Sequence, residues 1–146
     1  MTLDAAAPFA GHLPKRDDLT YFVTHPCHPP IFNEETDMAA KRDYFGGAAA
    51  KQHIVCALMQ GPESAYALGE KIGRTIYAPV MRSHRVTVDQ MALLEPGLSE
   101  TVVASLLDVM REAMDEVVSR GVPKEAARDF LLGHLNILGA VIFKEI

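Results

Sequence analysis

The stretch from residue 21 to residue 32 constrains the fold of this chain more than any other. An apolar run, Tyr21-Phe22-Val23, is followed at once by two His-Pro pairs that contain His25 and His28. A proline lacks a backbone N–H and restricts the residue before it, so a buried strand does not continue through it. We therefore expect a strand that leaves both histidines on a stiff loop at its carboxyl end, where ligands bind in open α/β sheets. A rigid turn with two surface histidines is the alternative interpretation.

The composition limits the class of protein. The chain is 49% hydrophobic and 23% charged, as is usual for a soluble domain with a core. A net charge of -5, with scattered lysines and arginines, argues against a nucleic-acid surface. We find no apolar run long enough for a membrane span and no signal peptide. Cys27 and Cys56 indicate reduced thiols in a cytoplasmic protein, although the sequence leaves a disulfide between them open.

Residues 53–82 predict a strand, a helix and a second strand. Residues 53–59 form a continuous apolar run, which is typical of a strand covered on both faces in a parallel sheet. Pro62 suits the first turn of a helix, and residues 77–82 have the pattern of another short strand. The sequence therefore predicts a βαβ unit. Its helix carries an apolar stripe that we expect in the core, made of Ala67, Leu68, Ile72 and Ile76.

From residue 86 onward the pattern is helical. Residues 88–95 predict a helix that Pro96-Gly97 breaks or kinks. Residues 99–119 predict a long amphipathic helix whose wide apolar stripe indicates burial between helices or in a dimer interface. Gly121 is suited to end that helix, and the last helix begins near Pro123.

The predicted fold class is therefore α/β followed by all-α. Residues 1–85 are expected to form the C-terminal part of a doubly wound Rossmann-like sheet. Residues 86–146 are expected to form the first helices of a substrate-binding and dimerisation domain. The loop-like start, and a last helix that reaches Ile146 without a cap, lead us to expect a chain truncated at both ends.

Four segments carry a resemblance to a known family: residues 21–29, 57–63, 91–96 and 130–136. They resemble the NAD(P)-dependent β-hydroxyacid and 6-phosphogluconate dehydrogenase superfamily, and are most similar to proteins with a 6-phosphogluconate dehydrogenase C-terminal-like domain. The resemblance implies NAD or NADP as cofactor and a hydroxy acid of the sugar-acid type as substrate. It also implies an oxidation that can be coupled to isomerisation, and a homodimer formed through the helical domain. The strand followed by His-Pro is also similar to prephenate dehydrogenases, in which a histidine there assists hydride transfer.

One departure from the family concerns the cofactor. These enzymes bind the dinucleotide through a glycine-rich βαβ unit at their N-terminus, and this sequence contains no Gly-x-Gly-x-x-Gly pattern. The glycine pair Gly46-Gly47 could cradle a phosphate, but a simple connection is the interpretation that we favour. We therefore expect that the main pyrophosphate site is missing from this sequence.

Three residues are the predicted catalytic groups. Oxidation of a hydroxy acid needs a base for the hydroxyl proton, and any isomerisation needs an acid and base for the enol. His25 is the first choice, because histidine titrates near neutral pH and because of its position and the resemblance. His28 is expected to orient His25 or the substrate. Glu95 is the third candidate, because it is an acid in an apolar helical run directly before a proline. The alternative interpretation is a solvated residue at a helix end.

The remaining candidates are contacts to substrate and cofactor. Lys51 or Arg82 could hold a substrate carboxylate, although each is also an ordinary surface charge. His134 is either a core histidine or a substrate contact. The complete predicted substrate-binding set is Asn33, Lys51, Arg82, His84, His134 and Asn136, and the predicted cofactor contacts are Thr24 and Pro26.

A metal site and two other functions were weighed against this interpretation. His25 and His28 could gather metal ligands with His53, His84 or Asp89, but the spacing matches no structural zinc pattern, so we predict no metal. A non-catalytic helical dimerisation or binding module is the main alternative function. A metal-dependent isomerase or hydrolase is the other.

Overall fold

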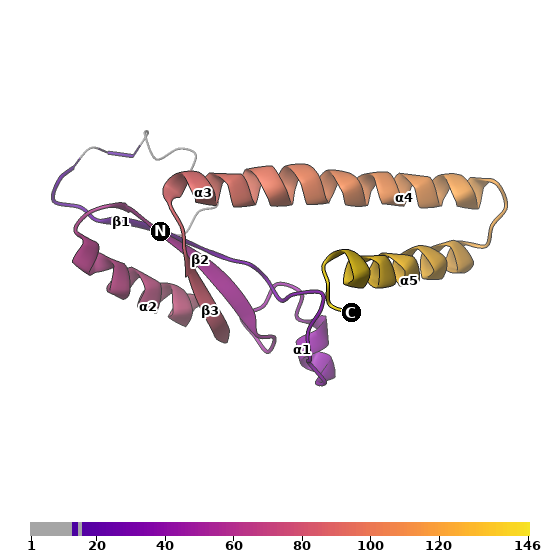
Figure 1. Ribbon diagram of the computed structural model, residues 1–146, viewed down its shortest axis with the longest axis horizontal. Coiled ribbons are helices and arrows are strands. Elements are labelled where there is room, and N and C mark those ends of the chain that lie inside the picture. Colours follow the sequence, from indigo (N-terminus) through magenta and orange to yellow (C-terminus); the bar gives the residue numbers. More distant parts are fainter. Residues whose placement is uncertain (1–12, 15) are drawn as a thin grey trace. The chain divides into compact units, whose positions relative to one another are not determined.

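The computed structural model describes residues 13, 14 and 16–146, and the chain separates into two units that meet after Leu98. The first unit holds a three-stranded sheet with the order β1-β2-β3 (Figure 1). Strand β1 (Tyr21–Pro26) runs antiparallel to β2 (Gln52–Gln60), and β2 runs parallel to β3 (Val80–Arg85). The α/β class predicted for this part of the chain is confirmed. The functional domain boundary after residue 85 stays a prediction.

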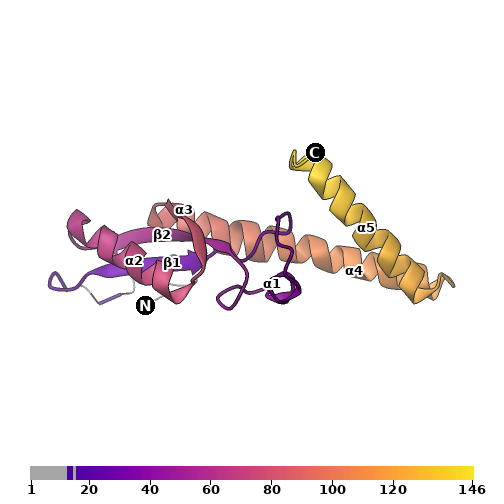
Figure 2. The same ribbon diagram turned by 90° about the horizontal axis from the view of Figure 1, so that it is seen from below.

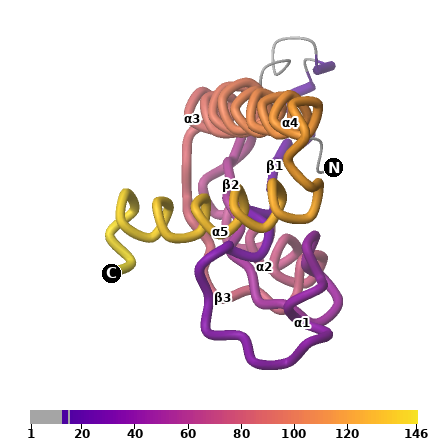
Figure 3. The backbone as a smooth tube through the Cα atoms, turned by 90° about the vertical axis from the view of Figure 1, so that its right-hand side faces the viewer, coloured from indigo at the N-terminus to yellow at the C-terminus, as the bar shows by residue number. Residues whose placement is uncertain are grey.

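Short helices connect the strands of the first unit. The connection from β1 to β2 is a wide loop that contains α1 (Met38–Arg42), as Figure 3 shows. A 3-10 turn, η3 (Glu63–Ala65), and helix α2 (Tyr66–Ile76) join β2 to β3, which confirms the predicted βαβ unit with its parallel strands. Helix α3 (Val88–Ala92) follows β3 and leads into a π-helical segment, η4 (Leu93–Val103).

The two faces of the sheet are covered by different helices. Helix α3 packs on one face, where Val23, Val55, Ala57 and Met91 form the buried core. Helix α2 packs on the other face, against β1 and β2 (Figure 2). Because side chains alternate along a strand, residues on β1 face α3 and α2 in turn.

The face of α2 that packs against the sheet differs from the prediction. The expected core stripe is wrong, because Leu68, Ile72 and Ile76 are 63%, 50% and 54% exposed. The helix instead meets β1 through Gly69 and Gly73. A Cβ atom added to Gly69 would lie 2.4 Å from the ring of Phe22 on β1, so only glycine allows this approach. The two glycines, rather than the apolar side chains, therefore decide which face of α2 is buried.

The second unit is a pair of helices, α4 (Ala104–Ser119) and α5 (Lys124–Ile142), joined by a short turn (Figure 1). Gly121 ends α4 with a φ of 97°, and its N–H bonds to the carbonyl of Val118 at 2.9 Å, which confirms the predicted stop. Met114 and Leu131 line the space between the two helices. No residue of α4 is buried among the described residues, so its wide apolar stripe is not buried between helices here.

Two helix ends also differ from the prediction. The predicted break at Pro96-Gly97 does not occur, because the chain continues through η4 in π-helical form, a known way to absorb a missing backbone donor; the alternative, a kink, stays a prediction. The last helix ends at Ile142 rather than at the chain terminus. Lys144 adopts a left-handed φ of 60°, and Glu145 donates to the carbonyl of Ala140 at 2.9 Å, so this end is capped.

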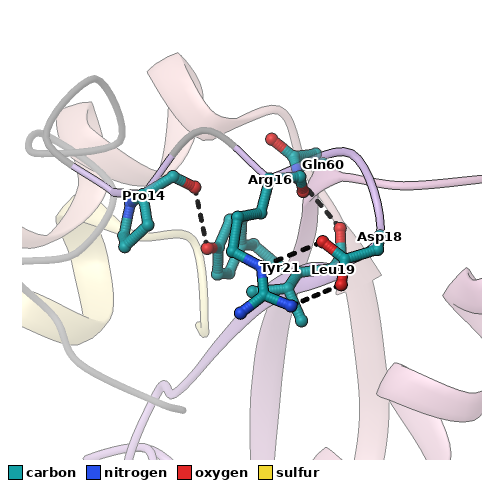
Figure 4. Close-up of polar contacts among 6 residues, drawn as sticks. All are labelled: Pro14, Arg16, Asp18, Leu19, Tyr21 and Gln60. Atoms are coloured by element: carbon teal, nitrogen blue, oxygen red, sulfur yellow. Dashed lines mark hydrogen bonds and ion pairs between the residues drawn. The ribbon is translucent and has the colours of Figure 1, made fainter.

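Polar contacts hold the segment before β1 against the end of β2 (Figure 4). The Tyr21 hydroxyl donates to the carbonyl of Pro14 at 2.9 Å. The Gln60 amide donates to the carbonyls of Arg16 and Leu19 at 2.7 and 2.8 Å. These bonds fix the start of β1 beside its partner strand. Among the described residues, no helix combines the length and the apolar composition that crossing a membrane requires.

Candidate functional site

One face of the sheet is apolar at one end and polar at the other. Under α3 it carries Val23, Val55 and Ala57. His25 pairs with Val55, Val55 pairs with His84, and His53 pairs with Arg82, so these residues share that face. The polar end of this face therefore gathers the side chains of His25, His53, Arg82 and His84.

The position of the histidines relative to the sheet corrects the prediction. Because β1 is antiparallel to β2, the carboxyl end of β1 lies beside the start of β2. Pro26 pairs with Ile54, and the backbone N–H of Cys27 donates to the carbonyl of His53 at 2.8 Å. The strand also continues through His25 to Pro26. In the sheet formed by the described residues β1 is an edge strand, so a proline at its last position removes no ladder bond that this sheet needs. His25 thus lies within the strand, at the edge opposite the carboxyl ends of the parallel pair.

The predicted catalytic residues His25 and Glu95 lie together. His25 is 7% exposed, and its Nδ1 atom lies 3.8 Å from Oε2 of Glu95 in η4. The Glu95 side chain is itself largely buried. A carboxylate at this distance complements the positive charge that the imidazole gains when it accepts a proton. The arrangement is suited to acid–base chemistry.

His28 is the third predicted catalytic residue, and it lies against His25. The two rings are edge to face, with centroids 5.9 Å apart. Nδ1 of His28 donates to the carbonyl of Phe45 at 2.9 Å, and His28 has a left-handed φ of 60°. The connection between β1 and β2 therefore fixes the ring of His28 beside that of His25.

A cavity of about 670 Å³ lies between the loop after β1, helix α1 and the start of β2. Two predicted substrate-binding residues, Asn33 and Lys51, line it. His53 and a second cation, Lys41, also line it, and the sequence interpretation gave neither a substrate role. His53 follows Gln52 at the start of β2, directly before an apolar run, but the sequence does not show the cavity beside it.

Asp43 organises one wall of this cavity. Its carboxylate accepts the backbone N–H groups of Gly46, Ala48, Ala49 and Ala50 at 3.0, 3.1, 2.8 and 3.1 Å. These bonds, chiefly from Ala49 and Ala50, hold the pKa of Asp43 below its usual value. The carboxylate thus fixes the loop that leads into Lys51.

The other predicted residues of the first unit lie outside the lining of the cavity. Arg82 and His84 are exposed on β3, and the rings of His84 and His53 have centroids 5.8 Å apart. Thr24 is buried on the α2 face, where the thiol of Cys56 donates to its hydroxyl at 3.2 Å. Pro26 is half-buried at the end of β1.

Both cysteines are free in the structure, and the reduced state of their thiols stays a prediction. Cys27 lies between the two predicted histidines in the sequence. Burial raises the pKa of its thiol, so the less nucleophilic neutral form is favoured.

His134 and Asn136 lie on α5 in the second unit, and both are exposed. The ring of His134 stacks on Phe130 with centroids 4.1 Å apart, and its Nδ1 donates to the carbonyl of Phe130 at 2.8 Å. The interpretation of His134 as a core histidine is therefore wrong, although its ring is hydrogen-bonded. In the part of the chain that the structure describes, no three His, Cys, Asp or Glu side chains are grouped to hold a metal ion.

Comparison with known proteins gives matches over the whole chain. The family described as phosphogluconate dehydrogenase (decarboxylating) C-term matches residues 33–146. Proteins named D-apionate oxidoisomerase from Rhizobium rhizogenes and Cupriavidus necator are 82% and 78% identical over 146 residues. The chain spans 53% of the length of each of these relatives. A crystal structure described as a semialdehyde dehydrogenase NAD-binding protein from Cupriavidus necator, in complex with calcium and NAD, is 78% identical. It has a TM-score of 0.96 and matches all of this chain and 53% of its own.

Replacement of Asp43 by alanine is expected to destabilise the first unit in a pH-dependent way. A depressed carboxyl pKa stabilises the fold above the unfolded value, near 3.8, and this stabilisation is lost as the pH falls through the folded value. We therefore expect a lower Tm for Asp43→Ala at about pH 7, and a difference that shrinks towards about pH 3. Thermal unfolding across this range is the measurement, with Asp17→Ala, an exposed carboxylate, as the control. A difference in Tm that does not change with pH would contradict this role.

Proposed function

Because this chain belongs to the phosphogluconate dehydrogenase (decarboxylating) C-terminal family, we propose that it is part of an NAD(P)-dependent oxidoreductase. The proposed substrate is a hydroxy acid of the sugar-acid type, and its oxidation is coupled to an isomerisation. The observation that carries the proposal is the buried His25–Glu95 pair, on a sheet face that reaches a polar cavity at His53. The relatives' name and the NAD in the related crystal structure support the substrate and cofactor classes.

The cavity is the proposed substrate site. Apionate is a carboxylate anion, and the Lys51 ammonium group is the cation that would hold it. Lys41 is a second positive charge in a lining that also contains Glu34, Glu35 and Asp43. The amide of Asn33 both donates and accepts, so it suits the hydroxyl groups of a sugar acid. The four other predicted substrate contacts stay predictions: Arg82, His84, His134 and Asn136.

His25 is the proposed acid–base residue. It would take the hydroxyl proton during oxidation and return a proton to the enol during isomerisation. Glu95 would complement the charge on the imidazolium. His28, which the carbonyl of Phe45 holds in place, would keep the His25 ring in position by its edge-to-face contact.

The Gly46-Gly47 turn is the candidate pyrophosphate site among the described residues. A pyrophosphate needs backbone N–H groups that are free to bind it. The turn at Gly46-Gly47 directs four N–H groups at one point, but the carboxylate of Asp43 accepts all four. This turn does not fit a pyrophosphate, and we assign no step through the nicotinamide to it. Thr24 and Pro26 stay predicted cofactor contacts, and Thr24 would use its main chain because its side chain is buried.

Binding of D-apionate tests the proposed substrate site. Lys51→Gln should weaken the affinity about 10- to 100-fold, because a hydrogen bond to a charged group is lost. Isothermal calorimetry on the purified chain is the measurement. The matched control is Lys71→Gln, which removes the same charge from an exposed position of α2 outside the cavity. Absence of D-apionate binding, or equal losses in the two variants, would contradict the proposal.

A second copy of this chain is the proposed partner of the helical unit. Large apolar side chains on α4 and α5 are exposed, among them Leu106, Val109, Phe130 and Ile142. Monomeric proteins rarely leave so much contiguous apolar surface open to water. This observation also favours the alternative function, a non-catalytic dimerisation module. Dimerisation without any binding of D-apionate would distinguish that alternative from the oxidoreductase.

Two substitutions on α4 test the dimer. Leu106 and Val109 are 59% and 61% exposed, so Leu106→Asp with Val109→Asp should leave the helix pair intact and place charges in the interface. We expect the wild type to elute as a dimer in sizing chromatography with light scattering, and the double variant as a monomer. Ser105→Asp, an exposed polar position on the same helix, is the control. A double variant that still elutes as a dimer would exclude this interface.

A further inference from the structure

His53 is the histidine of the polar sheet face that lines the cavity. It lies on β2, two residues after Lys51, which lines the same cavity. It is also the diagonal neighbour of His25 across the antiparallel pair, since His25 pairs with Val55. His25 and His84 share this face but do not line the cavity. His53 therefore connects the proposed substrate site to the proposed acid–base pair.

The environment of the imidazole selects one of its two neutral tautomers. Nδ1 of His53 is buried and has no hydrogen-bond partner among the described residues. A proton on this nitrogen would create a buried donor without an acceptor, which is among the least tolerated arrangements in proteins. An unprotonated Nδ1 is also unpaired, but a buried acceptor without a donor is found more often than a buried N–H without an acceptor. The proton of the neutral ring is therefore expected on Nε2.

The same environment keeps the ring neutral. Burial lowers the pKa of His53, and the neighbouring Arg82 and His84 side chains lower it further. Protonation would also place a proton on the buried Nδ1. His53 is thus poorly suited to act as a base, and well suited to remain a neutral hydrogen-bond donor at physiological pH. Neutral histidines that donate to a substrate oxygen are an established device for polarising a carbonyl group.

We propose that His53 is a substrate-contacting residue that donates a hydrogen bond from Nε2 to a hydroxyl or carbonyl oxygen of the hydroxy acid. Lys51 would hold the carboxylate of the same molecule. This inference rests on the proposed function and adds to it a residue and an electrostatic role. A neutral donor at this position polarises the oxygen at the reacting carbon without attracting the carboxylate away from Lys51.

Two substitutions distinguish the effect of the hydrogen-bond donor from the effect of the ring. His53→Phe keeps a ring of similar size and removes both nitrogens, and His53→Gln keeps an amide donor near the place of Nε2. We expect His53→Phe to bind D-apionate up to about tenfold more weakly than the wild type, and His53→Gln to recover most of that loss. Calorimetry gives the affinities, and thermal unfolding of each variant shows whether it is folded.

A measurement on the wild type keeps the inference testable if His53→Phe does not fold. Long-range proton–nitrogen NMR of the histidine rings should show Nε2 of His53 protonated and Nδ1 unprotonated. Addition of D-apionate should shift the Nε2 resonance. A proton on Nδ1, or an unchanged Nε2 resonance when D-apionate is bound, would overturn the inference.

The outcomes distinguish this inference from the proposed function. Equal affinity of the wild type and a folded His53→Phe variant, together with weaker binding by Lys51→Gln, would overturn the role of His53 and leave the substrate site in place. A wild-type chain that does not bind D-apionate would overturn the substrate class, and the role of His53 with it. Weaker binding by His53→Phe with recovery in His53→Gln supports both.

Discussion

The antiparallel pairing of β1 with β2 is the constraint on which the candidate site depends. Its register sets His25 opposite Val55, and so on the face that α3 and Glu95 cover. Since side chains alternate along a strand, a shift of one residue would turn His25 towards α2 and break its contact with Glu95. The buried contact of Val23 with the α3 core holds the register against such a shift.

One sheet face serves both stability and chemistry. Its apolar end packs under α3 around Met91. This packing positions the segment after α3 at the polar end of the face, where Glu95 lies beside His25. Pro96 comes directly after Glu95 in a π-helical segment, a form of helix that is often found at functional sites. The loop between β1 and β2 supplies the rest of the site, because Asp43 fixes its backbone and leads the chain into Lys51 and His53.

The sequence predicted the parts of this arrangement that depend on local patterns. The continuous apolar run before Gln60 indicated a parallel βαβ unit, and Gly121 indicated the end of α4. The antiparallel direction of β1 could not be predicted, because a short apolar run fits either direction. The buried face of α2 was also missed, since an apolar stripe is visible in a sequence, whereas a close approach at Gly69 depends on its partner Phe22. His53 could not be predicted as a substrate contact, because only the structure shows that it lines the cavity.

The central claim is that His25, paired with Glu95, transfers protons to and from a bound acid. Hydrogen–deuterium exchange at the carbon next to the carbonyl of hydroxypyruvate tests this most directly, because enolisation needs an acid and a base but no dinucleotide. NMR of the probe in deuterated water should show exchange catalysed by the wild type and by Cys27→Ser, a control from the same loop. His25→Gln should lower the catalysed rate by about 10² or more. Exchange at the wild-type rate in His25→Gln would contradict the account.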